Sequence, residues 1–400
     1  MSRWPRAPRT PFRADGSPIR VEPEALLADA RTPGFWDRHT TAPVLGGLVD
    51  GFRETSFLWR PTRRGTEAMV HINSVTDRHR EDITAARFAR IGGTDVHHVS
   101  VLLPDELVAS YRIVEAGHLP VDAGRDRPGW LRIHEAGVPD PLGSETLPNP
   151  LGRRSSVLRM PASRQHPAWR AARRDAGGAR QPVRLDTRHP LWAIDPDDEP
   201  AHLLVLFDGE TWRGLPLAAA LAQRDGPPLA VLLVDSGPQR ADLLPHPERI
   251  ASLVEEVVVP AARRRWPRAR DTVVAGQSYG GLAAASLAVL RPDLVSAAVA
   301  QSGSFQFRAG EERRRDATEP GDLIRRLGAL RVTARVHVQA GAEEHDLSAQ
   351  AEMFADAAER AGAVVTGEQR AGGHDYAWWS DALFDGLDVV LGRSLSRIEP

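Results

Sequence analysis

The sequence predicts an α/β protein that carries a separate β-rich part ahead of its α/β part. From about residue 185 onward, apolar runs of strand length alternate with segments of helix length. Alternation of this kind is typical of a parallel sheet covered by helices on both faces. Residues 51–114 instead contain short β-rich runs separated by turn residues, which is the pattern of a β-sandwich. The 400 residues also suffice for two domains of about 100–200 residues each.

Three segments follow from these patterns. Residues 1–20 are rich in Arg and Pro and are expected to form a disordered tail. Residues 21–150 form the expected sandwich domain, and residues 151–400 form the expected α/β domain. The first domain is expected to contain a short helix within 21–38, strands at 55–60, 68–73, 94–103 and 109–114, and a long loop at 115–150.

The second domain is expected to begin with a short strand at 155–161 and an exposed, Arg-rich excursion at 164–184. The strands predicted after it are 201–207, 229–235, 271–275, 295–300, 335–339 and 364–368. The predicted helices are 215–223, 247–265, 281–290, 348–361 and 377–391, with Ser348 as a plausible N-cap.

Composition excludes several chemistries. The chain has 51 basic and 53 acidic residues, so no basic excess is available for general binding to nucleic acid. Cys and Lys are both absent, which excludes disulfides, thiolate sites, a Cys nucleophile, Schiff-base chemistry and a Ser–Lys dyad. No apolar run of about 18 residues and no secretory h-region are found, so we expect no membrane span and a cytoplasmic location.

The sequence Gly276-Gln-Ser278-Tyr-Gly280 lies between a predicted strand and a predicted helix. This is the context of the nucleophile elbow of α/β hydrolases, in which a serine occupies a tight strand-to-helix turn. The glycines two before and two after the serine prevent collisions between side chains and backbone in such a turn. A turn of small residues without catalytic meaning is the alternative, but the flanking elements favour Ser278 as a nucleophile.

A serine nucleophile needs a general base, and in this fold the histidine follows the acid along the chain. His374 lies after the last predicted strand and before the last helix, behind two glycines that allow the loop to bend. His345 is the rival, but it occupies the loop where the acid is expected. We therefore predict His374 as the general base.

The acid should follow the preceding strand, where it would accept the Nδ1–H of the imidazole. Three carboxylates compete in this loop, and we rank Glu344 first, Asp346 second and Glu343 third. The oxyanion hole is expected to use the backbone N–H of Tyr279 together with one from Glu210 or Thr211, in the loop after the strand at 201–207.

These residues resemble those of the enterochelin esterase family, within the esterase-D-like α/β hydrolases. The resemblance covers roughly residues 20–395 and rests on blocks in both halves of the chain. GQSYGG (276–281) is common to many esterases, whereas GGHDYAWW (372–379) combined with GTDVHHVSVLLPDELVASYRI (93–113) is much more specific. The segment around 343–350 departs from the usual family pattern, and so the acid stays open among the three candidates.

The resemblance implies an Ig-like sandwich as the first domain and a serine esterase acting on cyclic catecholate siderophores, iron-bound or free. No organic or metal cofactor is expected, because iron would enter only with the substrate. A polyanionic, aromatic substrate suits Arg side chains and aromatic rings. The candidate contacts are Arg60, Arg112, Arg213, Arg240, Trp212 and Trp378. The alternatives are an esterase or acyltransferase for another acyl ester, and a catalytically silent binding protein.

Overall fold

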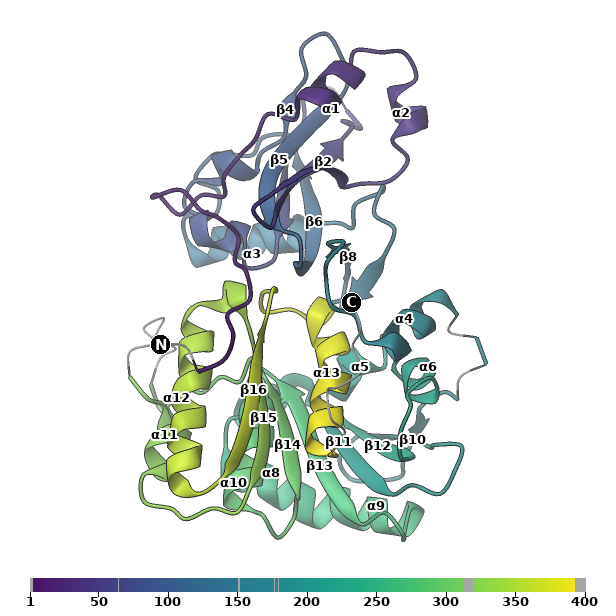
Figure 1. The fold of residues 1–400 in the computed structure, drawn as a ribbon, viewed down its shortest axis with the longest axis vertical. Helices are drawn as coiled ribbons and strands as arrows, with labels where there is room; N and C mark the ends of the chain where they lie inside the picture. Colours follow the sequence, from purple (N-terminus) through teal and green to yellow (C-terminus); the bar gives the residue numbers. More distant parts are fainter. Residues whose placement is uncertain are drawn as a thin grey trace. The chain divides into compact units, whose positions relative to one another are not determined.

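The computed structural model describes residues 3–63, 65–149, 152–175, 177–178, 180–311 and 319–392. The chain divides into two compact units (Figure 1). Unit 1 contains Met1–Arg6, Gln165–Arg370 and Trp379–Pro400, and unit 2 contains Ala7–Arg164 and Ala371–Trp378. The sandwich therefore continues to residue 164 instead of 150, and it also receives a short segment from near the end of the chain.

Unit 2 contains two four-stranded sheets in which every neighbouring pair is antiparallel. The first has the order β1 (Val44–Val49), β2 (Phe52–Trp59), β5 (His97–Pro104), β4 (Ala89–Arg90). The second has the order β3 (Glu67–Ile72), β6 (Val108–Ala116), β8 (Arg154–Arg159), β7 (Thr146–Pro148). One buried cluster joins Phe57 and Val99 of the first sheet to Val70 and Tyr111 of the second. The predicted sandwich is confirmed.

The described residues of unit 2 also form three α-helices and two 3-10 turns. They are α1 (Glu24–Asp29), α2 (Phe35–Arg38), η1 (Thr76–His79), η2 (Ile83–Ala86) and α3 (Arg127–Ala136). The long loop expected at 115–150 is wrong where α3 lies. Asp126 accepts a hydrogen bond from the N–H of Gly129 and caps this helix, and Trp130 and Ile133 are buried against the sheet. The Asp and Pro residues that suggested a loop are here helix-starting residues.

Unit 1 is built on an eight-stranded sheet (Figure 1). Its order is β16 (Val364–Arg370), β15 (Arg335–Gly341), β14 (Ala297–Gln301), β13 (Asp271–Gln277), β11 (His202–Phe207), β12 (Leu229–Val234), β10 (Leu191–Ile194), β9 (Val183–Arg184). The six strands from β16 to β12 are parallel to one another. β10 pairs antiparallel with β12, and β9 pairs antiparallel with β10. All six residues of β12 are buried, as expected for a parallel strand covered on both faces.

The helices of unit 1 cover both faces of this sheet (Figure 1). Ala298 and Ala300 of β14 belong to the buried cluster that includes α10 and α12, whereas Val299 faces Gly386 of α13. The α/β-hydrolase fold predicted for this part is confirmed. The α-helices are α4 (Pro167–Arg174), α5 (Gly209–Trp212), α6 (Leu217–Ala222), α7 (Arg240–Leu243), α8 (Pro247–Leu253), α9 (Val259–Arg265), α10 (Tyr279–Leu290), α11 (Asp322–Leu327), α12 (Asp346–Ala361) and α13 (Tyr376–Val390), with a π-helical turn, Val254–Val258, joining α8 to α9.

Three further expectations are corrected. The Arg-rich segment at 164–184 contains α4, whose Trp169 is buried against Trp212 and Phe384. The first twenty residues are not a free tail where they are described, because Trp4 packs on the core of unit 1. Ser348 is not an N-cap, since α12 already begins at Asp346. No helix in the described ranges combines the length and apolarity needed to cross a membrane.

Candidate active site

Ser278 occupies a strained turn between β13 and α10. Its φ of 57° and ψ of −118° are unfavourable for a residue with a side chain, and strain of this kind is concentrated at functional sites. A Cβ on Gly276 would lie 2.4 Å from the carbonyl carbon of Gly280, and one on Gly281 would lie 2.7 Å from the carbonyl oxygen of Gln301. Gly276 and Gly281 are therefore steric requirements of the turn, whereas a Cβ on Gly280 would have its nearest neighbour at 3.3 Å.

The loop after β14 holds the backbone of Ser278 on both sides. The Ser278 N–H donates to the carbonyl of Gln301 (3.0 Å), and the Ser304 N–H donates to the carbonyl of Ser278 (3.0 Å). The Oγ atoms of Ser278 and Ser304 lie 3.3 Å apart. Ser278 is half-buried and stands at the N-terminus of the 12-residue α10, where the helix dipole favours negative charge.

The two predicted oxyanion donors differ in what the structure allows. Tyr279 is the first residue of α10, and the first N–H groups of a helix have no partner within that helix. After β11, the Thr211 N–H already donates to the carbonyl of Asp208 (3.0 Å). The prediction of Thr211 as an oxyanion donor is therefore withdrawn. The Glu210 carboxylate accepts hydrogen bonds from two N–H groups after β12 and anchors this loop. Glu210 remains the candidate for the second N–H.

Glu344 is held in a short 3-10 turn (Ala342–Glu344) directly after β15. Its Oε2 accepts hydrogen bonds from Ser302 Oγ (2.7 Å) and from the Gly341 N–H (2.7 Å). Ser302 in turn accepts a hydrogen bond from Trp379 Nε1 (2.8 Å). Ser302 has a φ of 47° and is fully buried, so its hydroxyl has a fixed place between the indole and the carboxylate.

The three candidate acids lie in different surroundings. Glu344 is buried and ordered by two donors, whereas Asp346 is exposed at the start of α12, where a carboxylate stabilises the helix N-terminus. Glu343 is also buried, one position earlier in the same turn. The ordered, buried carboxylate is the geometry expected of a group that orients an imidazole, and this favours Glu344.

His374 lies in the segment that packs with unit 2. Its N–H donates to Ser74 Oγ (3.0 Å), in the turn that follows β3. A Cβ on Gly373 would lie 2.4 Å from that same hydroxyl, and one on Gly372 would lie 2.4 Å from the indole of Trp378. The two glycines before the histidine are thus required by close contacts, and the loop they shape leaves His374 half-buried.

Asp375, next to His374, has a structural role. It accepts hydrogen bonds from the N–H groups of Ala377 (2.8 Å) and Ser110, which ties the start of α13 to β6. Burial raises the pKa of this carboxyl above its ordinary value. Asp375 was not among the predicted site residues, and its contacts make it an anchor of the loop.

Three glutamines that the sequence analysis did not single out lie directly beneath the nucleophile. Gln277 and Gln301 are the last residues of β13 and β14, and Gln339 lies two residues before the end of β15, at the same register position. Gln277 donates to Gln301 (2.7 Å), and Gln301 donates to Gln339 (2.8 Å). Each precedes a turn or strand end that carries a site residue, so this buried ladder fixes the relative heights of those turns. The sequence signal that could have revealed this ladder is a glutamine near the end of each of three predicted strands.

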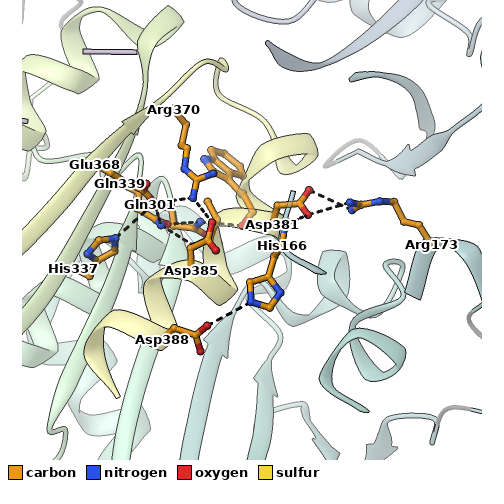
Figure 2. A network of polar contacts seen from close by, with 12 residues as sticks. His166, Arg173, Gln301, His337, Gln339, Glu368, Arg370, Asp381, Asp385 and Asp388 are labelled. Carbon is orange, nitrogen blue, oxygen red and sulfur yellow. Dashed lines mark hydrogen bonds and ion pairs between the residues drawn. The ribbon is translucent and has the colours of Figure 1, made fainter. Parts of the chain in front are cut away.

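The ladder continues into a charged network beside α13 (Figure 2). Gln339 donates to Glu368 (2.8 Å), and Arg370 pairs with Glu368 (3.0 Å) and with Asp385 of α13. Although burial opposes it, the nearby His337 ring (3.9 Å) and the charge of Arg370 hold the pKa of Glu368 below its ordinary value. Burial raises the pKa of Asp385. These contacts attach α13 to the edge of the sheet.

Among the predicted substrate contacts, Arg240 lies beside the nucleophile turn. Its guanidinium binds both carboxylate oxygens of Asp208 (2.8 and 2.7 Å) and donates to the carbonyl of Gln277 (3.3 Å). It also lies 5.6 Å from the ring of Tyr279. Arg240 therefore contacts the residues on either side of Ser278, while its side chain keeps 35% of its surface exposed.

The other predicted contacts are placed differently. Trp212 is fully buried and donates to Gln277 (3.1 Å), so its ring belongs to the core, which corrects the expected stacking role. Arg112 is buried in unit 2 and donates to the carbonyl of His134. Trp378 holds its own loop through a hydrogen bond to the Gly373 carbonyl. Arg213 pairs with Asp235 and lies over Trp192, and Arg60 is exposed, pairs with Asp95 and lies over Trp36.

One group of metal-ligand type occurs among the described residues: His71, Asp77 and His134 of unit 2. His71 Nε2 lies 2.8 Å from the Asp77 carboxylate, and Arg112 donates to Nδ1 of His134 (2.9 Å). Because Arg can only donate, the proton of neutral His134 resides on Nε2, which then faces Asp77 as a donor. His134 Nε2 lies 4.0 Å from Asp77 Oδ1. The group is accordingly a carboxylate–histidine network in which the proton on Nε2 keeps that nitrogen from ligating a metal.

Comparison with known proteins agrees with this architecture. Residues 54–169 match the family profile described as enterochelin esterase, N-terminal, and residues 192–389 match the profile named Esterase. The iron(III) enterobactin esterase of Dickeya dadantii is 31% identical and covers 87% of this chain and 90% of its own. The iron(III) salmochelin esterase of an Escherichia coli strain is 28% identical, with coverages of 88% and 90%.

A solved structure also resembles this chain over most of its length. The ferric enterobactin esterase of Salmonella typhimurium superposes with a TM-score of 0.78 at 26% identity, over 90% of this chain and 98% of its own. The same family is indicated by both profiles, by the relative that is 31% identical and by the similarity of fold. The chain belongs to the enterochelin (enterobactin) esterase family.

Proposed function

We propose that this protein is a serine esterase that hydrolyses the lactone ester bonds of cyclic catecholate siderophores, with or without bound iron. The observation that carries the proposal is the strained elbow at Ser278, set at the N-terminus of α10 in a chain of this family. The relatives named above act on iron(III) enterobactin and iron(III) salmochelin by their names. Their substrates define the class we propose here.

The proposed reaction has two halves. His374 removes the proton from Ser278 Oγ, which attacks the lactone carbonyl carbon and forms a tetrahedral intermediate. The N–H groups of Tyr279 and Glu210 stabilise its oxyanion. His374 then protonates the leaving alkoxide, which departs as the alcohol of the opened lactone and leaves an acyl-enzyme.

In the second half, His374 activates a water molecule that attacks the acyl-enzyme carbonyl. Collapse of the second intermediate returns the proton to Ser278 and releases the carboxylic acid. Glu344 is the group we assign to orient the imidazole, and the hydrogen bonds from Ser302 and Gly341 keep its carboxylate ordered for that task.

Arg240 is the best-supported of the proposed substrate contacts. It is cationic, partly exposed and in contact with the turn that carries the nucleophile. Catecholate oxygens are suitable acceptors for a guanidinium. Arg60 remains a proposed contact because it is exposed and stands over an aromatic ring.

Product analysis by mass spectrometry tests the proposal. The wild-type protein should convert ferric and iron-free enterobactin to linear hydrolysis products, and Ser278→Ala should form none while keeping its thermal unfolding profile. Parallel reactions with salmochelin and p-nitrophenyl acetate separate a siderophore esterase from a general esterase. If the wild-type protein leaves every ester intact and Ser278 resists a fluorophosphonate, the chain is a binding protein and the proposal fails. Cell fractionation tests the cytoplasmic location expected from the sequence.

A further inference from the structure

The loop that carries His374 receives hydrogen bonds from the sandwich. The Val108 N–H donates to the carbonyl of Ala371 (2.9 Å), and Val108 also forms a parallel bridge with Gly372. Beyond the histidine, the Ser110 N–H donates to the carboxylate of Asp375. Two residues of β6 therefore hold the loop both before and after His374.

Ser74 contacts His374 itself, and its hydroxyl has a defined direction. Ser74 Oγ donates to Asn73 Oδ1 (2.9 Å), which leaves its lone pairs to accept the N–H of His374 (3.0 Å). The close approach of Gly373 to Ser74 keeps these two segments of the chain in contact. The hydroxyl therefore defines the position of the His374 main chain.

Ser74 is itself held in an unusual conformation. Its φ is 62°, in the left-handed region that residues with side chains rarely adopt. The Ser74 N–H donates to Asp77 Oδ2 (2.7 Å), and the other carboxylate oxygen of Asp77 contacts His71 Nε2 (2.8 Å). The carboxylate–histidine network described above thus supports the turn that presents the hydroxyl to His374.

We propose that Ser74 is a positioning residue for the general base, and that the sandwich contributes to catalysis by fixing the backbone of His374. The inference rests on the proposed function, since it assigns Ser74 a role only through His374. A displacement of about 1 Å in a reacting group can lower a rate about a hundredfold. Loss of one of several backbone anchors should have a smaller effect, and we expect a fall in kcat of about tenfold, or about 1.4 kcal/mol.

Ser74→Gly is the informative variant. It removes the hydroxyl, and glycine adopts a φ of 62° without steric penalty, so the turn itself should form. Ser56→Ala is the matched control, because Ser56 Oγ bonds Ser100 Oγ (2.7 Å) inside the same sandwich. With p-nitrophenyl acetate, Ser74→Gly should lower kcat about tenfold with KM within twofold of wild type. Ser56→Ala should leave both constants unchanged.

His374→Ala provides the second arm of the test. In that background, Ser74→Gly should cause no further loss in the rate at which Ser278 reacts with a fluorophosphonate, because the hydroxyl acts through the histidine. A wild-type kcat for Ser74→Gly, or an equal loss with and without His374, overturns the inference. If His374→Ala alone retains wild-type hydrolysis, the proposed role of His374 fails first, and the failure is assigned to the proposed function.

Discussion

Replacing Ser302 by alanine should destabilise unit 1 and slow hydrolysis, whereas the same replacement at Ser286 should do neither. Both serines are buried, with 0% and 2% of their surface exposed. The Ser302 hydroxyl accepts from Trp379 Nε1 (2.8 Å) and donates to Glu344 Oε2 (2.7 Å). The Ser286 hydroxyl has no hydrogen-bond partner among the described residues.

The magnitude follows from the groups left without partners. Ser302→Ala leaves a buried indole N–H unsatisfied, which costs about 1–3 kcal/mol, and removes a hydrogen bond to a carboxylate, which contributes about 1.5–3 kcal/mol. Allowing for the desolvation that the lost hydroxyl no longer requires, we expect a decrease of about 3 kcal/mol in the free energy of unfolding. For a unit of this size the unfolding midpoint should fall by roughly 6–12 °C.

Ser286→Ala should change the free energy of unfolding by less than about 1 kcal/mol, in the stabilising direction, because alanine also favours the interior of α10. Thermal unfolding followed by tryptophan fluorescence measures both variants. Hydrolysis of p-nitrophenyl acetate should be about tenfold slower in Ser302→Ala, since Glu344 loses the hydrogen bond from the Ser302 hydroxyl. Equal midpoints for the two variants would refute the reasoning about Ser302.

Three further outcomes are expected. Gly276→Ala should fail to give folded protein, since its Cβ would lie 2.4 Å from the backbone of Gly280, whereas Gly280→Ala, with its nearest neighbour at 3.3 Å, should stay folded; circular dichroism separates them. Glu344→Gln should lower kcat at least tenfold and Asp346→Asn less than twofold in the same ester assay. Burial lowers the pKa of His134 to about 4, so the unfolded chain takes up a proton that the folded chain excludes. Unit 2 should therefore lose up to about 3 kcal/mol as the pH falls from about 6.5 to about 4, and His134→Gln should flatten that pH dependence in chemical denaturation.

The sheet of unit 1 and its nucleophile could be predicted because their signals are local. A run such as 229–234 is apolar at every position, which is what a strand buried on both faces requires. Gly276 and Gly280 lie next to Ser278 both in sequence and in space, so the elbow can be recognised from one short stretch of sequence. The order of nucleophile, acid and histidine then limited the acid to one short loop.

Burial and partners far along the chain could not be predicted in this way. Trp212 was expected to stack on a ligand because aromatic rings suit an aromatic substrate, but its indole is in the core, hydrogen-bonded to Gln277. The helices α3 and α4 were missed because their Asp, Pro and Arg residues resemble those of loops, and only Trp130 and Trp169 indicate a buried face. The sequence alone does not distinguish a tryptophan in the core from one in a binding site.

The motif at 372–379 shows how local sequence and distant contacts combine. Gly373 is required by contact with Ser74, 300 positions away from His374, while Trp379 orders Ser302 and through it Glu344. One short stretch therefore serves the proposed base through unit 2 and the proposed acid through unit 1. This explains why that stretch is a more specific family signature than the elbow: the elbow satisfies the geometry of one turn, whereas the motif must satisfy two units at once. A substitution in it should consequently be compensated only by changes at residues remote in the sequence.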